Sequence, residues 1–292
     1  MSISSCRPSA DVIIDNTAYR QMAVVTDSQI TTTKGGTYHF PKGTVLNAYE
    51  IAVYMVTYQL YYTIYDWATN NGYDFQNVAS AGTISSEGGT LPETFDDDRC
   101  QPVCDMTLWD WVTFCNAYSC YVGYEPVYYA DASYSDEIKS SADEKVAAYG
   151  SHPYIKAAAN GNRSPKNCTA NGYRIPSFAE WEYAARGGNC DAPEWSYQFA
   201  GSNDASEVAV YGGGKTSVVG TKKPNSLGIY DMCGNLWELV DTFDIDGSFG
   251  NRGGSYGADR KACAIGYNNG ITFGGNSCPP VWFTVRMTRS LK

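Results

Sequence analysis

The chain has 292 residues, 43% of them hydrophobic, so it is long enough to bury a substantial core. Its formal net charge is -10, and the sequence contains no cluster of basic residues. Both features argue against nucleic acid or an anionic membrane surface as a partner. No apolar run approaches the roughly 20 residues that span a bilayer. We therefore expect one large soluble domain.

The first 19 residues are expected to form an N-terminal tail. Ile3 to Cys6 resembles the end of a bacterial lipoprotein signal, in which Cys6 would carry the lipid. The charged and apolar parts of such a signal are missing, and a tail with an incidental cysteine is an equal alternative. A lipidated Cys6 predicts an extracytoplasmic, outer-surface lipoprotein that contacts the membrane only through its lipid anchor.

The chain contains 10 cysteines, whose spacings do not match the usual zinc-site pairs. An extracytoplasmic compartment would allow disulfides. The first candidates are Cys100 with Cys104 and Cys168 with Cys190, although the sequence alone does not set the connectivity. Other cysteines are expected to be small buried hydrophobic residues.

The first half of the chain predicts short strands followed by two helices. Residues 20–50 alternate β-branched residues and Tyr with Gly-rich turns, which is typical of hairpins. From Thr57, aromatic residues recur at near-helical spacing up to a stop at residues 70–72, and we expect this aromatic face to pack into the core. A second helix begins at Thr107, with Asp110 as its capping-box partner, and runs to about residue 119.

The second half predicts one clear helix within a loop-rich region. Ser177 and Glu180 form a capping box, and glycines end that helix after residue 186. Residues 131–170 are polar without periodicity, so we expect a surface excursion. Strand candidates are residues 208–211, 237–240 and 281–287. Together these elements indicate an α+β, loop-rich single domain.

Six stretches stand out along the chain: residues 49–50 (YE), 101–103 (QPV), 173–188 (YRIPSFAEWEYAARGG), 199–202 (FAGS), 224–238 (PNSLGIYDMCGNLWE) and 252–256 (RGGSY). In sequence and in order, they resemble the motifs of the formylglycine-generating-enzyme (sulfatase-modifying factor) domain family. The resemblance implies the family's C-type-lectin-like fold over residues 20–288.

Enzymes of this family, as the resemblance implies, use a copper-binding cysteine pair that follows the Gly-Gly-Ser-Tyr motif. Two thiolates suit monovalent copper, and one sulfur does not complete a two-coordinate site. Here Ala258 stands at the first cysteine position and Cys263 at the second. His39 and His152 lie far apart in the sequence and suggest no replacement site. We therefore expect no copper and no catalysis.

The resemblance also implies one structural calcium, or magnesium, in the Asp-x-x-Gly-x-x-x-Glu stretch. Asp231 and Glu238 would supply carboxylates, and Gly234 and Leu236 backbone carbonyls, all of which are ligands suited to hard cations. The alternative is that Asp231 caps a turn and Glu238 pairs with an arginine. The candidate arginines are Arg186 and Arg252.

The C-terminal layout is similar to that of retroelement-diversified variable proteins of this fold, those of the spirochaete Treponema among them. In such proteins the changing residues follow the Gly-Gly-Ser motif, which predicts a variable, ligand-binding segment at residues 256–282, hereafter the variable segment. Its Tyr, Asn and Asp content resembles that of antibody paratopes. The closing motif departs from the pattern, with Trp282 at the usual glycine and Thr284 at the usual arginine. The expected ligand contacts are Tyr256, Ala258, Asp259, Ala262, Asn268, Asn269, Ile271, Phe273 and Trp282.

The sequence therefore predicts a monomeric, surface-displayed, non-catalytic binding protein whose ligand is unknown, with a protein or other cell-surface target expected. Two alternatives stay open. One is an oxidase of the family that uses Cys263 with some other sulfur, and the other is a structural lipoprotein with a fixed partner. An ordinary Gly-rich loop that closes the domain is the plain alternative to a variable segment.

Overall fold

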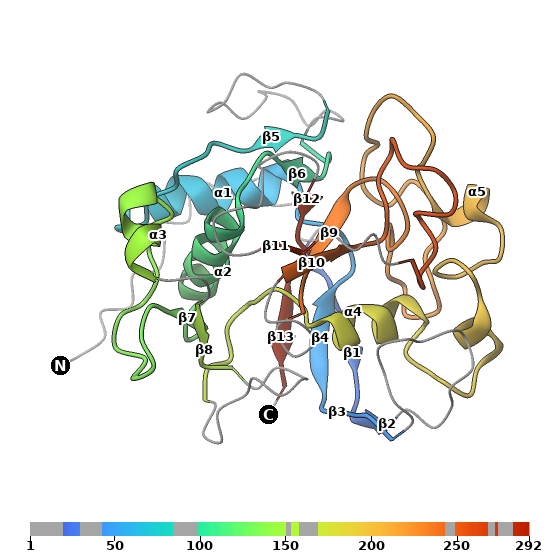
Figure 1. Cartoon of the computed structure of the whole chain (residues 1–292), viewed down its shortest axis with the longest axis horizontal. Coiled ribbons are helices and arrows are strands. Elements are labelled where there is room, and N and C mark those ends of the chain that lie inside the picture. The colour runs from blue at the N-terminus through green and yellow to red at the C-terminus, as the bar shows by residue number, and fades with distance from the viewer. Residues whose placement is uncertain are drawn as a thin grey trace.

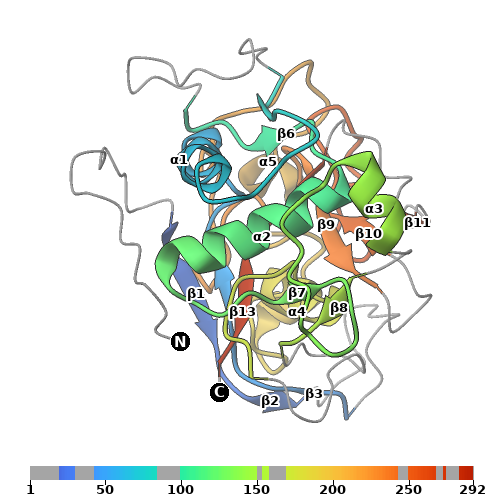
Figure 2. The ribbon, with the colours of Figure 1, turned by 90° about the vertical axis from the view of Figure 1, so that its left-hand side faces the viewer.

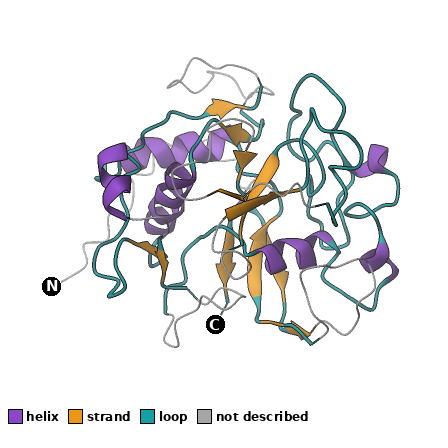
Figure 3. Cartoon of the chain, in the orientation of Figure 1, coloured by secondary structure: helices purple, strands orange, loops and turns teal. Residues whose placement is uncertain are grey.

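The computed structural model describes residues 20–29, 43–83, 99–149, 153–157, 169–242, 249–267, 272–273 and 283–291. Helices lie mainly to one side of a group of small central sheets, and the other side is rich in loops (Figures 1 and 3). Its elements in chain order are β1 (Met22–Val25), β2 (Ser28–Gln29), β3 (Val45–Leu46), β4 (Tyr49–Ala52), α1 (Tyr58–Thr69), β5 (Ser80–Ala81), β6 (Val103–Cys104), α2 (Leu108–Val122), β7 (Tyr128–Tyr129), α3 (Asp143–Tyr149), β8 (Tyr154–Ile155), α4 (Phe178–Ala185), the 3-10 helix η2 (Pro193–Ser196), α5 (Ala205–Val208), β9 (Trp237–Asp241), β10 (Phe249–Arg252), β11 (Thr272–Phe273), β12 (Phe283–Thr284) and β13 (Thr288–Ser290).

Two sheets form the centre of the domain. One has the order β1-β4-β13 and is antiparallel throughout. The other has the order β11-β10-β9-β12, in which β12 runs parallel to β9. A bridge between Arg174 and Thr288 and another between Ser177 and Asp241 tie the start of α4 to both sheets.

Strand β9 separates the two main hydrophobic clusters, because successive side chains of a strand point to opposite faces. Leu239 belongs to the cluster formed with α1 and α2, whereas Val240 belongs to the cluster formed with α4, β1 and β4. Figure 2 shows α2 crossing in front of the central strands. The predicted aromatic face of α1 packs into the first cluster, where Tyr58 and Tyr61 are fully buried.

The three predicted helices are confirmed, with small differences at their ends. Thr107 and Ser177 each accept a hydrogen bond from the backbone N–H three residues later, in complete capping boxes with Asp110 and Glu180. Helix α2 continues to Val122, beyond the expected end, and stops at a left-handed glycine.

Two expectations about the remaining segments are wrong. Residues 208–211 do not form a strand, since α5 ends at Val208 and only Val210 makes a bridge, to Gly234. The stretch 131–170 is not merely a surface excursion. It contains α3 and β8, and its residues Ile138, Val146 and Ile155 are buried in the cluster of α1 and α2.

Candidate functional site

Three buried arginine–glutamate groups hold the family motifs together. Arg174 forms two hydrogen bonds with Glu180, at 2.6 and 2.7 Å. Glu182 receives two arginines, one of which, Arg186, lies 2.9 Å away. Because an unpaired charge in the interior is costly, each group stabilises the motif only while its partners stay in place.

The third group is the pair of Glu238 with Arg286. The arginine partner is therefore neither of the two that the sequence suggested. The Arg286 guanidinium donates to both carboxylate oxygens of Glu238, at 2.7 and 3.0 Å. Trp181 Nε1 donates to one of the same oxygens at 2.8 Å. Arg186 and Arg252 instead bind Glu182. Thr284, at the position where an arginine is usual, is buried and uncharged. Arg286, two residues later, is the buried arginine near the closing strand.

Asp231 lies in the same region and has one oxygen without a partner. Its Oδ2 accepts a hydrogen bond from Gly220 N at 2.7 Å, whereas no group in the described part of the chain hydrogen-bonds to the buried Oδ1. Burial raises the pKa of the Asp231 carboxyl to about 6, partly offset by the Gly220 hydrogen bond. The alternative that Asp231 caps a turn therefore accounts for only one of its two oxygens.

These residues fit a hard cation at Asp231. Asp231, Gly234 and Asn235 all have positive φ, so the chain turns sharply around this point. The Oδ1 atom offers a free ligand, and Glu238 Oε1 accepts only one of the hydrogen bonds named above, from Arg286. Two carboxylates with one guanidinium leave a net negative charge, which a divalent ion would balance. Gly234 and Leu236 stay the predicted carbonyl ligands.

Cys263, which stands at the second position of the family's cysteine pair, lies against the glycines of the Arg252–Tyr256 motif. Gly254 has φ +79°, and a Cβ there would lie 2.7 Å from Cys263 Sγ. Cys263 is fully buried, and burial raises the pKa of its thiol to about 12. Cys233, in the same cluster, has its thiol pKa raised to about 12 by burial as well.

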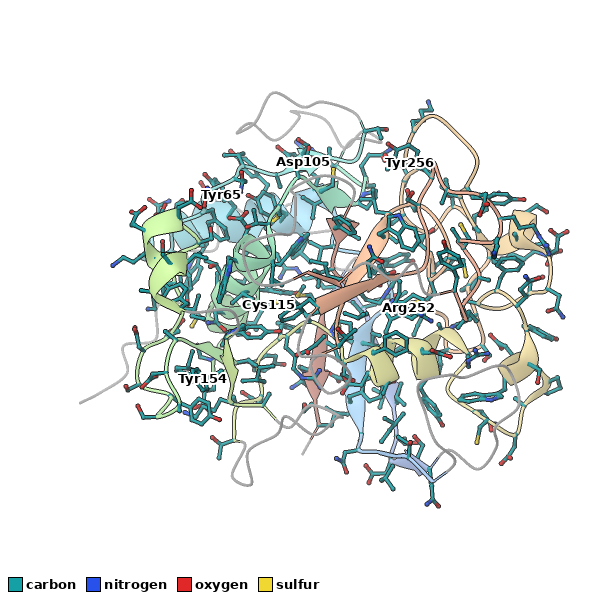
Figure 4. The ribbon with its side chains drawn as sticks, in the orientation of Figure 1. Tyr65, Asp105, Cys115, Tyr154, Arg252 and Tyr256 are labelled. Carbon is teal, nitrogen blue, oxygen red and sulfur yellow. The ribbon has the colours of Figure 1, made fainter. Side chains whose placement is uncertain are left out.

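The variable segment begins with a residue that does not face solvent. Tyr256 is only 4% exposed and packs with Met55, Cys104 and Leu236, so its expected role as an exposed ligand contact is wrong. Figure 4 shows Tyr256 at the top of the loop-rich side and Arg252 nearer the molecule's centre.

The next residues of the variable segment do reach the surface. Gly257 and Asp259 are exposed, and Ala258 and Ala262 are partly exposed. The Asp259 carboxylate accepts a hydrogen bond from Ala262 N at 2.8 Å, which stabilises the turn. Three of the predicted contacts, Ala258, Asp259 and Ala262, therefore lie together in one short surface turn.

Residues outside the variable segment support this turn through two sets of contacts. Gly212 N donates to Ala258 O at 2.9 Å, and Gly213 N donates to Tyr256 O at 2.7 Å. Arg260 stacks over the Phe199 ring at 4.9 Å and donates to Gln198 Oε1 at 3.2 Å. Sequence reasoning did not identify these supports. The only local signal was the run of glycines at 212–214.

The other predicted contacts are placed only in part. Asn268, Asn269, Ile271 and Trp282 lie outside the described residues. The backbone of Phe273 belongs to β11, which pairs with β10 through Phe249. Cys6, His39 and His152 also lie outside the described residues. These positions stay predictions from the sequence.

The expected disulfide between Cys100 and Cys104 is wrong, because both residues are free thiols. Cys104 Sγ instead donates to Gly82 O at 3.2 Å inside the protein. Cys168, the other predicted partner, lies outside the described residues, and Cys190 Sγ is 3.7 Å from Gln29 O. In the described part of the chain, no helix is both long and apolar enough to cross a membrane.

Similar solved structures share this architecture over nearly the whole chain. A structure titled "Crystal Structure of CarF" has a TM-score of 0.70 and 25% sequence identity, and the match covers 93% of this chain and 98% of that one. Treponema denticola variable protein 1 has a TM-score of 0.62 at 21% identity, with coverage of 92% and 95%. The fold is thus α+β of the formylglycine-generating-enzyme type, as the motifs predicted.

Sequence relatives point to the same class. The chaperone protein LppX of Paenibacillus barcinonensis is 32% identical over 170 residues, 51% of this chain and 54% of that protein. The formylglycine-generating enzyme of Mycobacterium tuberculosis is 32% identical over 115 residues, 34% of this chain and 36% of that protein. That of Mus musculus is 28% identical over 139 residues, 40% and 36%. The matches span between about a third and about half the length of these relatives.

A family model described as the sulfatase-modifying factor enzyme 1-like domain matches residues 13–276. The chain belongs to this family.

Proposed function

We propose that this protein is a non-catalytic, ligand-binding member of its family and that the exposed part of the variable segment forms its ligand surface. The observation that carries this proposal is the surface turn at Gly257–Ala262. Main-chain hydrogen bonds from Gly212 and Gly213 hold it, so side chains such as that of Ala258 can change without loss of support. Separation of a fixed scaffold from changeable side chains is typical of binding loops.

The environment of Cys263 supports the absence of catalysis. Monovalent copper binds thiolates, and one accessible pair of them is needed for a two-coordinate site. Cys263 is fully buried with a raised thiol pKa, and Ala258 stands where the first cysteine is expected.

The test is incubation of the protein with copper(I), oxygen and a sulfatase-motif peptide, followed by mass spectrometry for formylglycine. We expect no aldehyde product, while the Mycobacterium tuberculosis enzyme serves as the positive control. Turnover by this protein that disappears in Cys263→Ala would overturn the proposal. It would favour the second candidate, an oxidase that uses Cys263 with Cys233, the other buried cysteine of the same hydrophobic cluster.

Diversification is tested on the gene. Sequencing its 3' end across isolates should reveal substitutions concentrated at exposed positions such as Ala258 and Ala262, with Tyr256 and Cys263 unchanged. An invariant segment would instead favour a structural protein with a fixed partner. The ligand itself, a protein or other cell-surface target, and the monomeric state belong to the same proposal.

Display outside the cytoplasm is also part of the proposal, through a lipid on Cys6. Metabolic labelling with a radioactive fatty acid should mark the natural protein and not its Cys6→Ser variant. Equal labelling of both forms, or no labelling of either, would remove the anchor from the proposal.

A further inference from the structure

The loop of residues 231–236 is joined to the start of the variable segment through the main chain. Gly234 N donates to Gly253 O at 2.7 Å, and Tyr256 N donates to Asn235 O at 2.8 Å. Leu236 also belongs to the same small hydrophobic cluster as Tyr256. A change in the position of this loop therefore displaces the turn on which the variable segment begins.

The same loop supports the other side of the variable segment. Asn235 N donates to Val210 O at 2.8 Å, and a Cβ on Gly234 would clash with that oxygen, so the two segments are in direct contact. Two residues after Val210, the N–H groups of Gly212 and Gly213 bind the carbonyls of the variable segment. The loop at 231–236 is thus connected both to the start of the variable segment and to the segment at 210–213 that supports the surface turn.

Asp231 opens this loop, and its Oδ2 is bound by Gly220 N whereas its Oδ1 has no hydrogen-bond partner among the described residues. The residue is 2% exposed, and this oxygen is buried. A buried carboxylate oxygen without a partner is destabilising, and a divalent cation bound to oxygen ligands would remove this cost. This unpartnered oxygen destabilises the loop of residues 231–236. A cation that binds the oxygen should therefore make the loop more rigid.

We infer that a divalent cation at Asp231 orders the supports of the variable segment, so that the ligand surface is fully formed only when the cation is bound. The consequence for ligand affinity rests on the proposed binding function, whereas the ordering itself does not. By linkage, the cation raises affinity for the ligand by the factor by which the ligand raises affinity for the cation.

The test is hydrogen–deuterium exchange of the whole chain, freed of metal with a chelator and then titrated with calcium or magnesium alone. We expect the amides of residues 210–213, 234–235 and 253–258 to exchange at least about tenfold more slowly with the cation. The amides of helix α1, remote in sequence from this loop, provide the internal reference. Asp231→Ala, which removes the ligand oxygen, should abolish the change, whereas Asp66→Ala, at an exposed position on α1, should retain it.

Two results would overturn the inference, and neither requires a folded variant. One is a wild-type chain whose hydrogen–deuterium exchange and melting temperature do not change when calcium or magnesium is added. The other is a cation that raises the melting temperature but leaves exchange at residues 210–213 and 253–258 unchanged. The sequencing of isolates is independent of both, so an invariant variable segment would refute the proposed function while slowed exchange still upheld the coupling.

Discussion

Arg286 is fully buried and uses all of its N–H groups inside the protein. Beyond the pair with Glu238, its NH1 group donates to the carbonyls of Ala52 and Val53, both at 2.9 Å, and its NH2 group donates to Tyr230 O at 2.8 Å. A guanidinium has five donors in a fixed geometry, and an ammonium cannot reproduce this set. One side chain therefore joins the end of β4 to the loop before Asp231 and to β9.

Replacement of Arg286 by Met should reduce the free energy of unfolding by about 3–5 kcal/mol, because Glu238 would be left buried without its partner. Urea denaturation monitored by tryptophan fluorescence measures the loss. The matched control is Arg289→Met, which breaks the partly exposed pair with Glu50 and should cost about 1 kcal/mol or less. Equal losses in the two variants would contradict this account of the buried pair.

The thiol of Cys263 should be nearly inert in the folded protein. Its pKa is raised from an ordinary value near 9 to about 12 by burial, so the folded state holds the proton more tightly than the unfolded state. The resulting stability is present below pH 9 and is lost as pH rises toward 12. At pH 8, iodoacetamide should modify native Cys263 at least about 100-fold more slowly than the urea-unfolded chain.

Peptide mapping of the alkylated protein by mass spectrometry provides the measurement, and the partly exposed thiol of Cys100 provides the internal comparison. Rapid alkylation of Cys263 in the folded protein would mean that its sulfur is accessible, and this would favour a catalytic role for the thiol.

At single positions, the sequence predicted which kind of interaction a residue makes better than it predicted the partner or the burial of that residue. It placed Glu238 beside an arginine but not beside the right one, because charge complementarity does not distinguish Arg286 from Arg186 or Arg252. It also placed Tyr256 on the surface, since a tyrosine in a Gly-rich stretch carries no local sign of burial. That burial depends on Met55, about 200 residues away in the chain.

Among the elements, those with local signals were predicted well. Helices α1, α2 and α4 each begin at a hydroxyl residue whose side chain accepts a backbone hydrogen bond, and such caps are readable within four residues. Helix α3 was missed because only Val146 among its residues is buried. A helix with one apolar contact shows no periodicity in its sequence.

The turn at residues 253–254 allows a paired prediction about glycine. Gly254→Ala should destabilise the protein by about 1–3 kcal/mol or more, because φ is +79° and the new Cβ would meet Cys263. Gly257→Ala should change stability by less than about 1 kcal/mol, since its φ is not in the left-handed region and no atom lies within 4 Å of the Cβ position. Thermal unfolding of both variants checks the contrast, and similar melting temperatures would contradict it.

For the whole molecule, the arrangement of the two hydrophobic clusters explains why the motifs recovered the fold but not the site. The motif residues bury their side chains on either side of β9, so their packing requires one architecture. The surface turn at Gly257–Ala262 takes little part in either cluster. Its position depends on main-chain bonds to residues 212–213, and backbone hydrogen bonding between distant loops leaves little trace in side-chain sequence.

This division predicts how the whole domain tolerates substitution. Simultaneous replacement of Ala258, Lys261 and Ala262 by mixtures of Tyr, Asn and Ser should change the free energy of unfolding by within about 0.5 kcal/mol per site, since these side chains are exposed or partly exposed. Tyr256→Ala, two residues before the first of them, should cost about 3–5 kcal/mol, because it removes a buried ring from the small cluster that Tyr256 forms with Met55, Cys104 and Leu236.

Thermal and urea unfolding of such a library, beside Tyr256→Ala and the unchanged chain, measures both effects. If most triple variants lost as much stability as Tyr256→Ala, the turn would be part of the scaffold. Residues that the scaffold needs cannot be freely exchanged, so a diversified ligand surface would then be excluded at this turn. If the library keeps the stability of the parent, the same scaffold can present many side-chain combinations, which is the physical requirement for a variable binding protein.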